Sequence, residues 1–335
     1  MDRNRLHGAG SMGKVRLAVD VDSGDFGANV LLHGVLDAMR SSATAFEAVL
    51  CGDERKIRRV LDAALGKQSR LRKRITVVHC GQQVAAEERR RIWVWKSLKD
   101  AAIIRCISLQ KEARVDASVS AGDTAVLMGA ALFILGRRAG ALRPALAAFL
   151  PTMKKSPVLL LDVGANLRCR AEHLVSFADM GLEYIRETQR KSIPRVALLN
   201  IGRERVKGMA AVGDADRLLR ARRRGYIGFI EGNQVLSGVA DVVVCDGFAG
   251  NALLKTCESF YQLIASILGK KKRLLGELQK HIAVLDPENY GAVPFLGIKG
   301  IVLKAHGGSS RRAIASAVLA AERTARRKRG SRLFA

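Results

Sequence analysis

Glycine-rich turns carry the side chains of this chain that are best suited to chemistry. Each turn follows a β-branched or leucine-rich run and precedes a helical pattern, so each opens a helix at the end of a strand. Glycine lets a backbone approach a ligand closely, and the free N–H groups of a first helical turn attract anions. The clearest turns span Ser120–Thr124, Asp162–Asn166, Asp246–Asn251 and His306–Ser310. Together they predict an anion-binding site.

These turns do not match the common nucleotide and hydrolase motifs. The sequence lacks G-x-x-x-x-G-K-[ST], which disfavours a Walker-type nucleotide site. It has no G-x-G-x-x-G after the first expected strand and no G-x-S-x-G, so a standard dinucleotide site and a serine-hydrolase triad are also disfavoured. The six cysteines form no C-x-x-C pair, and we expect no metal site.

The elements that position the turns alternate between strands and helices. Runs such as Val158–Leu161 and Val242–Val244 are apolar throughout, as in central strands that are buried on both faces. This alternation indicates a three-layer α/β/α sandwich with a mostly parallel sheet, whose site lies beyond the carboxyl ends of the strands. We expect a short disordered leader at residues 1–14 and a single α/β/α domain at 15–330, with a helical excursion at about 269–289.

The chain carries a formal net charge of +26 at pH 7. A strong basic excess favours a polyanionic partner, although ordinary surface composition is the other explanation. Aromatic residues make up only 5% of the chain and do not interleave with its basic runs, so no nucleic-acid partner is expected. The longest strongly apolar stretch, Ala125–Gly136, is shorter than the roughly 20 residues of a membrane-spanning helix. We expect a cytoplasmic protein, with peripheral contact to a membrane left open.

The same turns carry a resemblance to a known family. The segments are, in chain order, VSAGDTAVLMGAALFILGR, RPALAAFLPT, LLLDVGAN with AEHLVSFADMG, RVALLNIGRERVKG, ADVVVCDGFAGNALLKT and YGAVPFLGIKGIVLKAHGGSS. In this order, from about Arg16 to Ala325, the chain resembles the phosphate acyltransferases usually called PlsX. The resemblance implies a homodimeric enzyme of phospholipid synthesis, similar in fold to phosphotransacetylases and isocitrate-type dehydrogenases. It implies acyl-[acyl carrier protein] and orthophosphate as substrates, acyl phosphate as product, and no metal or organic cofactor.

The turn residues can be given roles in such an acyl transfer. Orthophosphate is itself a nucleophile, so the protein has to position it beside a thioester carbonyl and stabilise the developing oxyanion. The residues assigned to catalysis are Lys255 and Asn251 for phosphate or oxyanion, His306 for the leaving thiolate or phosphate, and Asp246 for orienting Lys255 or backbone donors. Backbone amides after Gly164 and Gly250 are the expected donors. The residues assigned to substrate and phosphate binding are Gly24, Asp25, Ser120, Gly122, Thr124, Asp162, Gly164, Asn166, Gly250 and Ser309.

Some turns depart from the family pattern. Ser23 and Asp22 alter the first turn, Asp123 replaces the usual Asn, Asn233 replaces the usual Arg, and Glu87–Ala102 replaces a D-E-P stretch and the segment after it. An acid near a phosphate is unfavourable unless it is protonated or turned away. Two alternatives therefore stay open: an acyl-CoA:phosphate transferase of the phosphotransacetylase type, and a basic membrane- or nucleic-acid-binding protein on the same scaffold without the activity.

The excursion has its own pattern. It begins with Lys270–Arg273, which is entirely basic, and continues with Leu274, Leu278, Ile282 and Leu285 along one helical stripe. A basic amphipathic element of this kind suits an anionic membrane surface, which it would contact through residues 270–286. A helix that packs in a dimer is the alternative.

Overall fold

The structure, a computed structural model, describes residues 14–328 apart from 67, 86, 89–92, 155, 205–206, 223–224, 269–272, 275 and 277–285. The expected leader at 1–14 and most of the expected excursion at 269–289 therefore lie outside the described residues. The described chain groups into two compact units. Unit 1 contains the residues up to Gly136 and those from Gly300 to the end of the last helix, and unit 2 runs from Arg137 to Lys299. The expectation of one domain over 15–330 stays a prediction.

Parallel strands form the sheet of unit 1, in the order β3-β2-β1-β4-β11. Their bounds are β1 Arg16–Asp20, β2 Glu47–Gly52, β3 Ile75–His79, β4 Ala117–Ser120 and β11 Ile301–Ala305. The central strands β1 and β4 are buried almost throughout, as expected for strands that are covered on both faces. Because the strands are parallel, the turns that follow β1, β4 and β11 emerge at the same edge of the sheet.

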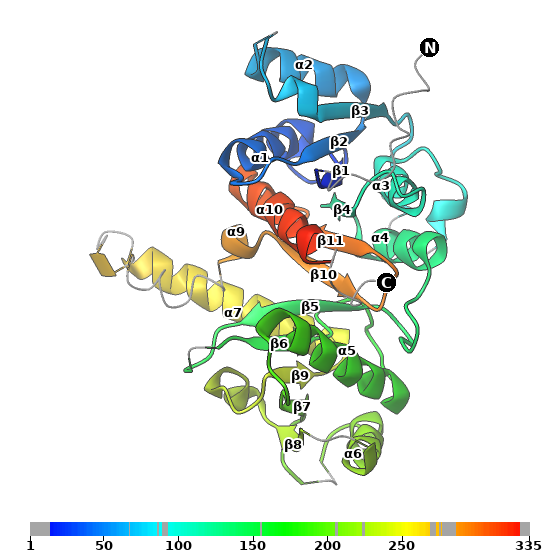
Figure 1. Ribbon diagram of the computed structural model, residues 1–335. Coiled ribbons are helices and arrows are strands. Elements are labelled where there is room, and N and C mark those ends of the chain that lie inside the picture. Colours follow the sequence, from blue (N-terminus) through cyan, green and yellow to red (C-terminus); the bar gives the residue numbers. More distant parts are fainter. Residues whose placement is uncertain are drawn as a thin grey trace. The chain divides into compact units, whose positions relative to one another are not determined.

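Helices cover both faces of this sheet (Figure 1). The bounds are α1 Gly27–Ser41, α2 Glu54–Ala64, α3 Ala102–Lys111, α4 Thr124–Ala130 and α10 Arg311–Lys328, with short turns η1 Arg72–Arg74, η2 Val94–Lys96 and the π-helical η3 Ala131–Leu135. α1 and α10 pack together on one face, while α3 and α4 lie on the other. The apolar stretch Ala125–Gly136 is therefore helical as far as Leu135, since it is covered by α4 and the π-helical η3.

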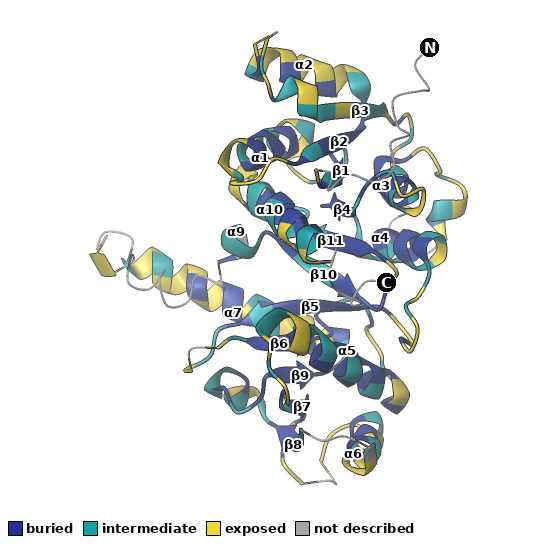
Figure 2. Cartoon of the chain, viewed as in Figure 1, coloured by how far each residue is buried: buried dark blue, intermediate teal, exposed yellow. Residues whose placement is uncertain are grey.

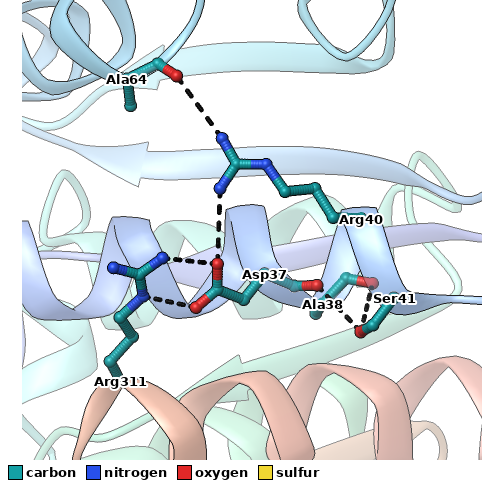
Figure 3. A network of polar contacts seen from close by, with 6 residues as sticks. All are labelled: Asp37, Ala38, Arg40, Ser41, Ala64 and Arg311. Atoms are coloured by element: carbon teal, nitrogen blue, oxygen red, sulfur yellow. Dashed lines mark hydrogen bonds and ion pairs between the residues drawn. The ribbon is translucent and has the colours of Figure 1, made fainter.

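α1 and α10 are joined by close packing and by an ion pair. Gly34 allows a close approach, because a Cβ there would lie 2.7 Å from the Arg311 carbonyl oxygen and from Ile314 Cβ. Arg311 Nη2 donates to Asp37 Oδ1 (2.6 Å) and its Nε donates to Oδ2 (Figure 3). Arg40 donates to the same carboxylate and to the Ala64 carbonyl oxygen (both 3.4 Å). The guanidinium of Arg311 holds the pKa of Asp37 below its usual value.

The sheet of unit 2 is mixed, in the order β10-β5-β6-β9-β7-β8. Its strands are β5 Ala145–Leu150, β6 Val158–Leu161, β7 Val196–Leu199, β8 Tyr226–Ile230, β9 Val242–Val244 and β10 Ala292–Leu296. β5 is antiparallel to both β6 and β10, whereas β6, β9, β7 and β8 pair in parallel. The predicted α/β class with a mostly parallel sheet is therefore confirmed, with an antiparallel part that the sequence analysis did not predict.

The helices of unit 2 are α5 Ala171–Gln189, α6 Ala210–Arg222, α7 Gly247–Leu268 and the short α9 Pro287–Tyr290, with the turn η4 Gly232–Ser237. α5 packs against α6, β9 and β6, and α7 contacts β5 and β6. Figure 2 shows buried strands and helices whose outward faces are exposed. Among the described residues, none of the helices combines the length and the apolar character that crossing a membrane requires.

Candidate active site

The Asp162 carboxylate organises the turn after β6 in unit 2. Its Oδ1 accepts hydrogen bonds from the backbone N–H groups of Leu146 (3.0 Å), Gly164 (3.1 Å) and Ala165 (3.0 Å). Its Oδ2 accepts from the backbone N–H of Asn166 (2.7 Å) and from the Asn166 side-chain amide (2.8 Å). Asp162 is fully buried, and burial raises the pKa of its carboxyl. The amides of the Gly164 turn, which the sequence analysis assigns to an external anion, are thus bound to Asp162.

Asn166 also points into the protein. Its side-chain amide donates to the Pro144 carbonyl oxygen (2.7 Å) as well as to Asp162, and only 6% of the residue is exposed. Gly164 adopts a φ of +136°, a conformation that favours glycine. Direct contact of Asp162, Gly164 and Asn166 with a phosphate stays a prediction, and it would require these internal hydrogen bonds to be replaced.

The turn before α7 is packed onto this first turn. Gly247 N–H donates to the Asn166 carbonyl oxygen (2.8 Å). A Cβ at Gly250 would lie 1.9 Å from the Asp162 carbonyl oxygen, so no side chain fits there. Asp246 caps the helix, because its Oδ1 accepts from the Ala249 N–H (2.8 Å). The two turns therefore form one rigid base, and Gly250 contributes close backbone packing to it.

Asn251 and Lys255 lie on the first turns of α7. Asn251 is exposed, and its Oδ1 lies 3.7 Å from where a Cβ of Gly164 would be. Lys255 Nζ forms an ion pair with Glu258 Oε2 (2.7 Å), and the lysine side chain is 43% exposed. Glu258 is buried and accepts a second hydrogen bond from the Tyr290 hydroxyl. The sequence analysis missed Glu258, although its position three residues after Lys255 predicts contact on a helix.

In unit 1 the buried Asp20 organises the turn after β1. Its Oδ1 accepts from the backbone N–H groups of Asp22 (3.2 Å) and Ser23 (3.1 Å), and its Oδ2 accepts from the Ser120 hydroxyl (2.6 Å). Ser120 Oγ in turn accepts from the Gly122 N–H (3.0 Å). Burial raises the pKa of Asp20 to about 6. Ser120 thus links the turn after β1 to the turn after β4. The sequence analysis did not select Asp20.

A cavity of about 390 Å³ opens at the carboxyl ends of β1, β4 and β11 in unit 1. Five residues that the sequence analysis selected line it, namely Gly24, Asp25, Gly122, Thr124 and His306. Ser309 is buried outside the lining, where its N–H donates to the His306 carbonyl oxygen (3.1 Å). Unselected lining residues include Asp22, Gln82, Gln83 and Lys304. Asp22 and Lys304 lie beside selected turns in the sequence, whereas Gln82 and Gln83 are brought to the cavity only by the fold.

Carboxylates are prominent in the lining of this cavity. Asp22, Asp25 and Asp123 face it together with the basic side chains Lys304 and His306. Asp123 caps α4, because its Oδ1 accepts from the N–H groups of Ala125 (2.9 Å) and Val126 (3.1 Å). Desolvation raises the pKa of Asp22, and that carboxylate accepts from the Asp53 N–H (2.8 Å). The replacement of Asn by Asp at 123 is therefore accommodated as a helix cap.

His306 holds one tautomer beside Asp25. Its Nδ1 accepts from the Gly308 N–H (3.1 Å), so a neutral ring carries its proton on Nε2. Asp25 N–H donates to the Gly307 carbonyl oxygen (2.9 Å), and a Cβ at Gly307 would lie 2.8 Å from Asp25 Oδ2. The glycine at 307 thus lets the two turns approach each other.

The selected residues fall into two groups. Those in unit 1 are Gly24, Asp25, Ser120, Gly122, Thr124, His306 and Ser309, and those in unit 2 are Asp162, Gly164, Asn166, Asp246, Gly250, Asn251 and Lys255. Within each group the turns meet at one edge of the unit's sheet. In the described part of the chain, no group of three or more His, Cys, Asp and Glu side chains is arranged to hold a metal ion.

Comparison with known proteins identifies the family. A family model described as "Fatty acid synthesis protein" matches residues 15–332. The phosphate acyltransferase of Aeromonas salmonicida (strain A449) is 36% identical over 321 residues, which cover 92% of this chain and 93% of that protein. The phosphate acyltransferase of Campylobacter concisus (strain 13826) is 35% identical over 321 residues, with the same coverage of both chains.

Solved structures share the fold at low sequence identity. A phosphotransacetylase from Streptococcus pyogenes has a TM-score of 0.64 and 15% identity, over 93% of this chain and 94% of that chain. A branched-chain phosphotransacylase from Enterococcus faecalis V583 has a TM-score of 0.60 and 13% identity, over 93% and 99% of the two chains. A 4-hydroxythreonine-4-phosphate dehydrogenase from Klebsiella pneumoniae has a TM-score of 0.53 and 15% identity, over 94% and 99% of the two chains. The phosphotransacetylase-like fold is confirmed, and the chain belongs to the fatty acid synthesis protein family, as an acyltransferase among the phosphate acyltransferases.

Proposed function

We propose that this protein transfers an acyl group from the thioester of an acyl carrier protein to orthophosphate, and so forms acyl phosphate for phospholipid synthesis. Membership of the family and the names of the relatives support an acyltransferase that uses phosphate. The observation that carries the proposal is the close packing of two turns in unit 2, Asp162–Asn166 and Asp246–Asn251. This pair holds Asn251 and Lys255 on a rigid base at the start of α7.

The reaction needs no covalent bond between substrate and protein. An oxygen of hydrogen phosphate attacks the carbonyl carbon of the thioester, the carbon–sulfur bond breaks, and the thiolate leaves with the electron pair. The proton that hydrogen phosphate gives up balances the proton that the thiolate takes up. The protein therefore has to position a dianion, stabilise an oxyanion and help one proton to move.

In this proposal Lys255 supplies the positive charge for phosphate or for the oxyanion. An ammonium group has three donors, and the ion pair with Glu258 leaves the half-exposed lysine able to donate to an incoming anion. Asn251, one helical turn earlier, offers an exposed side-chain amide as a further donor. Glu258 and Tyr290 are positioning residues, since they hold the lysine from its buried side.

In this proposal the aspartates of the two turns hold other residues in place and do not contact the substrate. Asp162 and Asn166 hold the first turn by hydrogen bonds inside the protein. Asp246 caps α7 and so fixes the helix that carries Lys255. We therefore assign Asp162, Asn166 and Asp246 to positioning, with Gly250 providing the close contact between the turns.

His306 is the proposed proton donor for the leaving thiolate. Its Nδ1 is engaged by the Gly308 N–H, so the neutral ring presents a donor at Nε2. An imidazole can give up and regain a proton near neutral pH. This role is compatible with its place in the lining of the unit 1 cavity.

The direct test is to incubate the full chain with phosphate and an acyl-carrier thioester, and to measure release of the carrier thiol. Lys255→Ala should lower kcat/KM by about 100-fold or more, because removing an oxyanion donor has an effect of that size. Arg217→Ala is the matched control, since Arg217 forms an i,i+3 ion pair with Asp214 on α6 of the same unit and is 78% exposed. Full activity of Lys255→Ala would contradict the proposed role.

The carrier of the acyl group is a separate part of the proposal. The formal charge of +26 favours an acidic carrier protein over coenzyme A, because electrostatic attraction to a protein surface acts over a large area. We expect kcat/KM for acyl-carrier protein to fall more steeply with added salt than kcat/KM for acyl-CoA. A preference for acyl-CoA at every salt concentration would favour the phosphotransacetylase-type alternative.

We also propose that the protein works as a homodimer. α7 exposes an apolar stripe of Phe260, Leu263, Ile264 and Ile267, whose spacing places them on one face of the helix. Exposed apolar groups gathered in this way suit a protein interface. Leu263→Glu should convert the dimer to a monomer in size-exclusion chromatography with light scattering, and a wild-type monomer would contradict the proposal.

The proposed location is the cytoplasm with peripheral membrane contact. The segment assigned to that contact, 270–286, lies mostly outside the described residues, and the support is its basic amphipathic sequence. Flotation of the full chain with vesicles of anionic lipid at low salt tests it. Failure to float would end the membrane assignment.

A further inference from the structure

The cavity of unit 1 has the wrong electrostatics for a phosphate site. Asp22, Asp25 and Asp123 line it, and only Lys304 and His306 oppose them among the described lining residues. A phosphate dianion would be repelled by such carboxylates unless they were protonated. The glycine-rich backbone around the cavity is nevertheless the kind that accepts a ligand closely. The cavity thus calls for a ligand other than a free anion.

Several backbone amides around the cavity are already used inside the protein. The N–H groups of Asp22 and Ser23 donate to Asp20, and the N–H of Gly122 donates to Ser120 Oγ. The N–H groups of the first turn of α4 are capped by Asp123. These particular amides therefore donate to the protein itself and not to a bound anion.

Acceptors, by contrast, remain available. Asp25 is exposed at the cavity, and within the described residues its carboxylate has no hydrogen-bond partner. The same holds for the Gln83 side chain within the described part of the chain. Val84 and Ala101–Ile103 add an apolar strip to the lining. A ligand that matches this lining carries N–H or O–H donors and some apolar surface, and no strong negative charge.

We infer that this cavity binds the pantetheine arm of the acyl thioester. The inference rests on the proposed function, which brings a thioester to this protein. The arm is a neutral chain with amide N–H groups, hydroxyl groups and a dimethyl branch, so it can donate to Asp25 and Gln83 and pack on Val84. A cavity of about 390 Å³ lies in the range that small-molecule sites occupy. His306 belongs to the same lining, and the inference assigns it to the thiol end of the arm.

The arm is shared by carrier-protein and coenzyme A thioesters, so the test uses the arm itself. Acyl phosphate formation is measured with S-acyl-pantetheine and with S-acyl-N-acetylcysteamine, a thioester that lacks most of the arm. Asp25→Ala should lower kcat/KM at least about tenfold more for the pantetheine thioester, since it removes a charged acceptor that only the longer arm reaches. Asp62→Ala, which removes an exposed acid of α2 in the same unit, should leave the ratio unchanged.

Several outcomes separate the inference from the function on which it rests. Equal losses with both thioesters would overturn the inference, and so would a raised KM for phosphate in Asp25→Ala. Absence of acyl phosphate from the wild type with either thioester, and with acyl-carrier protein, would mean that the proposed function itself fails. If the thioesters of carrier protein and of coenzyme A respond to Asp25→Ala by the same factor, the shared arm is the group that the cavity recognises. If they respond by different factors, the cavity recognises the carrier and the inference is wrong.

A measurement on the wild type keeps the inference testable if Asp25→Ala does not fold. Free pantetheine should inhibit competitively against S-acyl-pantetheine and non-competitively against phosphate. Gln83→Ala, a substitution at an exposed position, should raise the inhibition constant severalfold. Competition against phosphate instead would assign the cavity to phosphate and overturn the inference.

Discussion

Asp20 in unit 1 and Asp162 in unit 2 occupy comparable places, each buried at the carboxyl end of a parallel strand. Asp162 accepts hydrogen bonds from four backbone amides and the Asn166 side chain. Asp20 accepts from two backbone amides and the Ser120 hydroxyl. In both units the aspartate takes up the amides that a glycine-rich turn would otherwise offer to an anion. The two units therefore differ in the number of hydrogen bonds that the buried carboxylate accepts, and a variant at each aspartate should show that difference.

The largest effect is expected at Asp162. Asp162→Ala leaves several buried N–H groups without an acceptor, and each such group costs about 1–3 kcal/mol. We expect a loss of about 5 kcal/mol or more in the free energy of unfolding, measured by urea denaturation. Asp20→Ala should cost about half as much, because fewer donors depend on it. A larger loss for Asp20→Ala would reverse the comparison between the two turns.

The next effect concerns the glycines beside these aspartates. Gly250→Ala places a Cβ 1.9 Å from the Asp162 carbonyl oxygen, which is backbone and cannot turn aside. We expect a cost of more than about 3 kcal/mol. Gly122→Ala meets Ile103 Cδ1 at 2.8 Å, which is the far end of a flexible side chain, and Ser23 Cβ at 2.9 Å, which moves only with its backbone. Because part of this clash can be relieved, a smaller cost of about 1–2 kcal/mol is expected. Urea denaturation of the two variants measures both costs. Equal costs would mean that the turns of unit 2 are packed no more tightly than those of unit 1.

Sequence reasoning reaches the strands and the helix starts because their signals are local. The apolar run Val242–Val244 and the turn Asp246–Asn251 predict a strand followed by a helix, and the structure has β9 and α7 there. It does not reach β5, because Ala145–Leu150 is rich in alanine, which has weak strand preference, and its pairing with β6 and β10 is not encoded locally. The antiparallel part of the sheet therefore has no clear signature in the sequence.

The site is predicted in its residue types more than in its contacts. Glycine at 250 is predicted as a close approach, but the partner is the Asp162 backbone and not a ligand. Asp162 accepts a hydrogen bond from the backbone N–H of Leu146, sixteen residues earlier, and only the folded sheet brings these two residues together. Glu258 is visible from its spacing to Lys255, whereas Tyr290 lies 32 residues beyond Glu258 and is placed by tertiary structure. Spacing within one helix can be read, and contacts between elements cannot.

A pH dependence follows from Asp20. Burial raises its pKa from 3.8 to about 6, so between these values the folded protein keeps a proton that the unfolded chain has lost. The free energy of unfolding should therefore fall as the pH rises through this window, by up to about 3 kcal/mol, and level off above it. The difference between wild type and Asp20→Asn isolates this contribution in urea denaturation at pH 4 to 7.5. A difference that does not change with pH would show that Asp20 ionises normally.

The smallest effect is expected at Asp123. Asparagine caps a helix about as well as aspartate, so Asp123→Asn should change the free energy of unfolding by less than about 0.5 kcal/mol. Asp123→Ala removes the cap and should cost about 1 kcal/mol. The same Asn variant removes one negative charge from the unit 1 cavity, which would strengthen phosphate binding there. If phosphate binds instead beside Lys255, Asp123 is not part of the phosphate site, and the KM for phosphate should stay within about twofold of the wild-type value. A KM for phosphate that falls severalfold in Asp123→Asn would mean that the acidic cavity is the phosphate site. The turns of the two units would then suit the same ligand and differ only in how tightly they bind it.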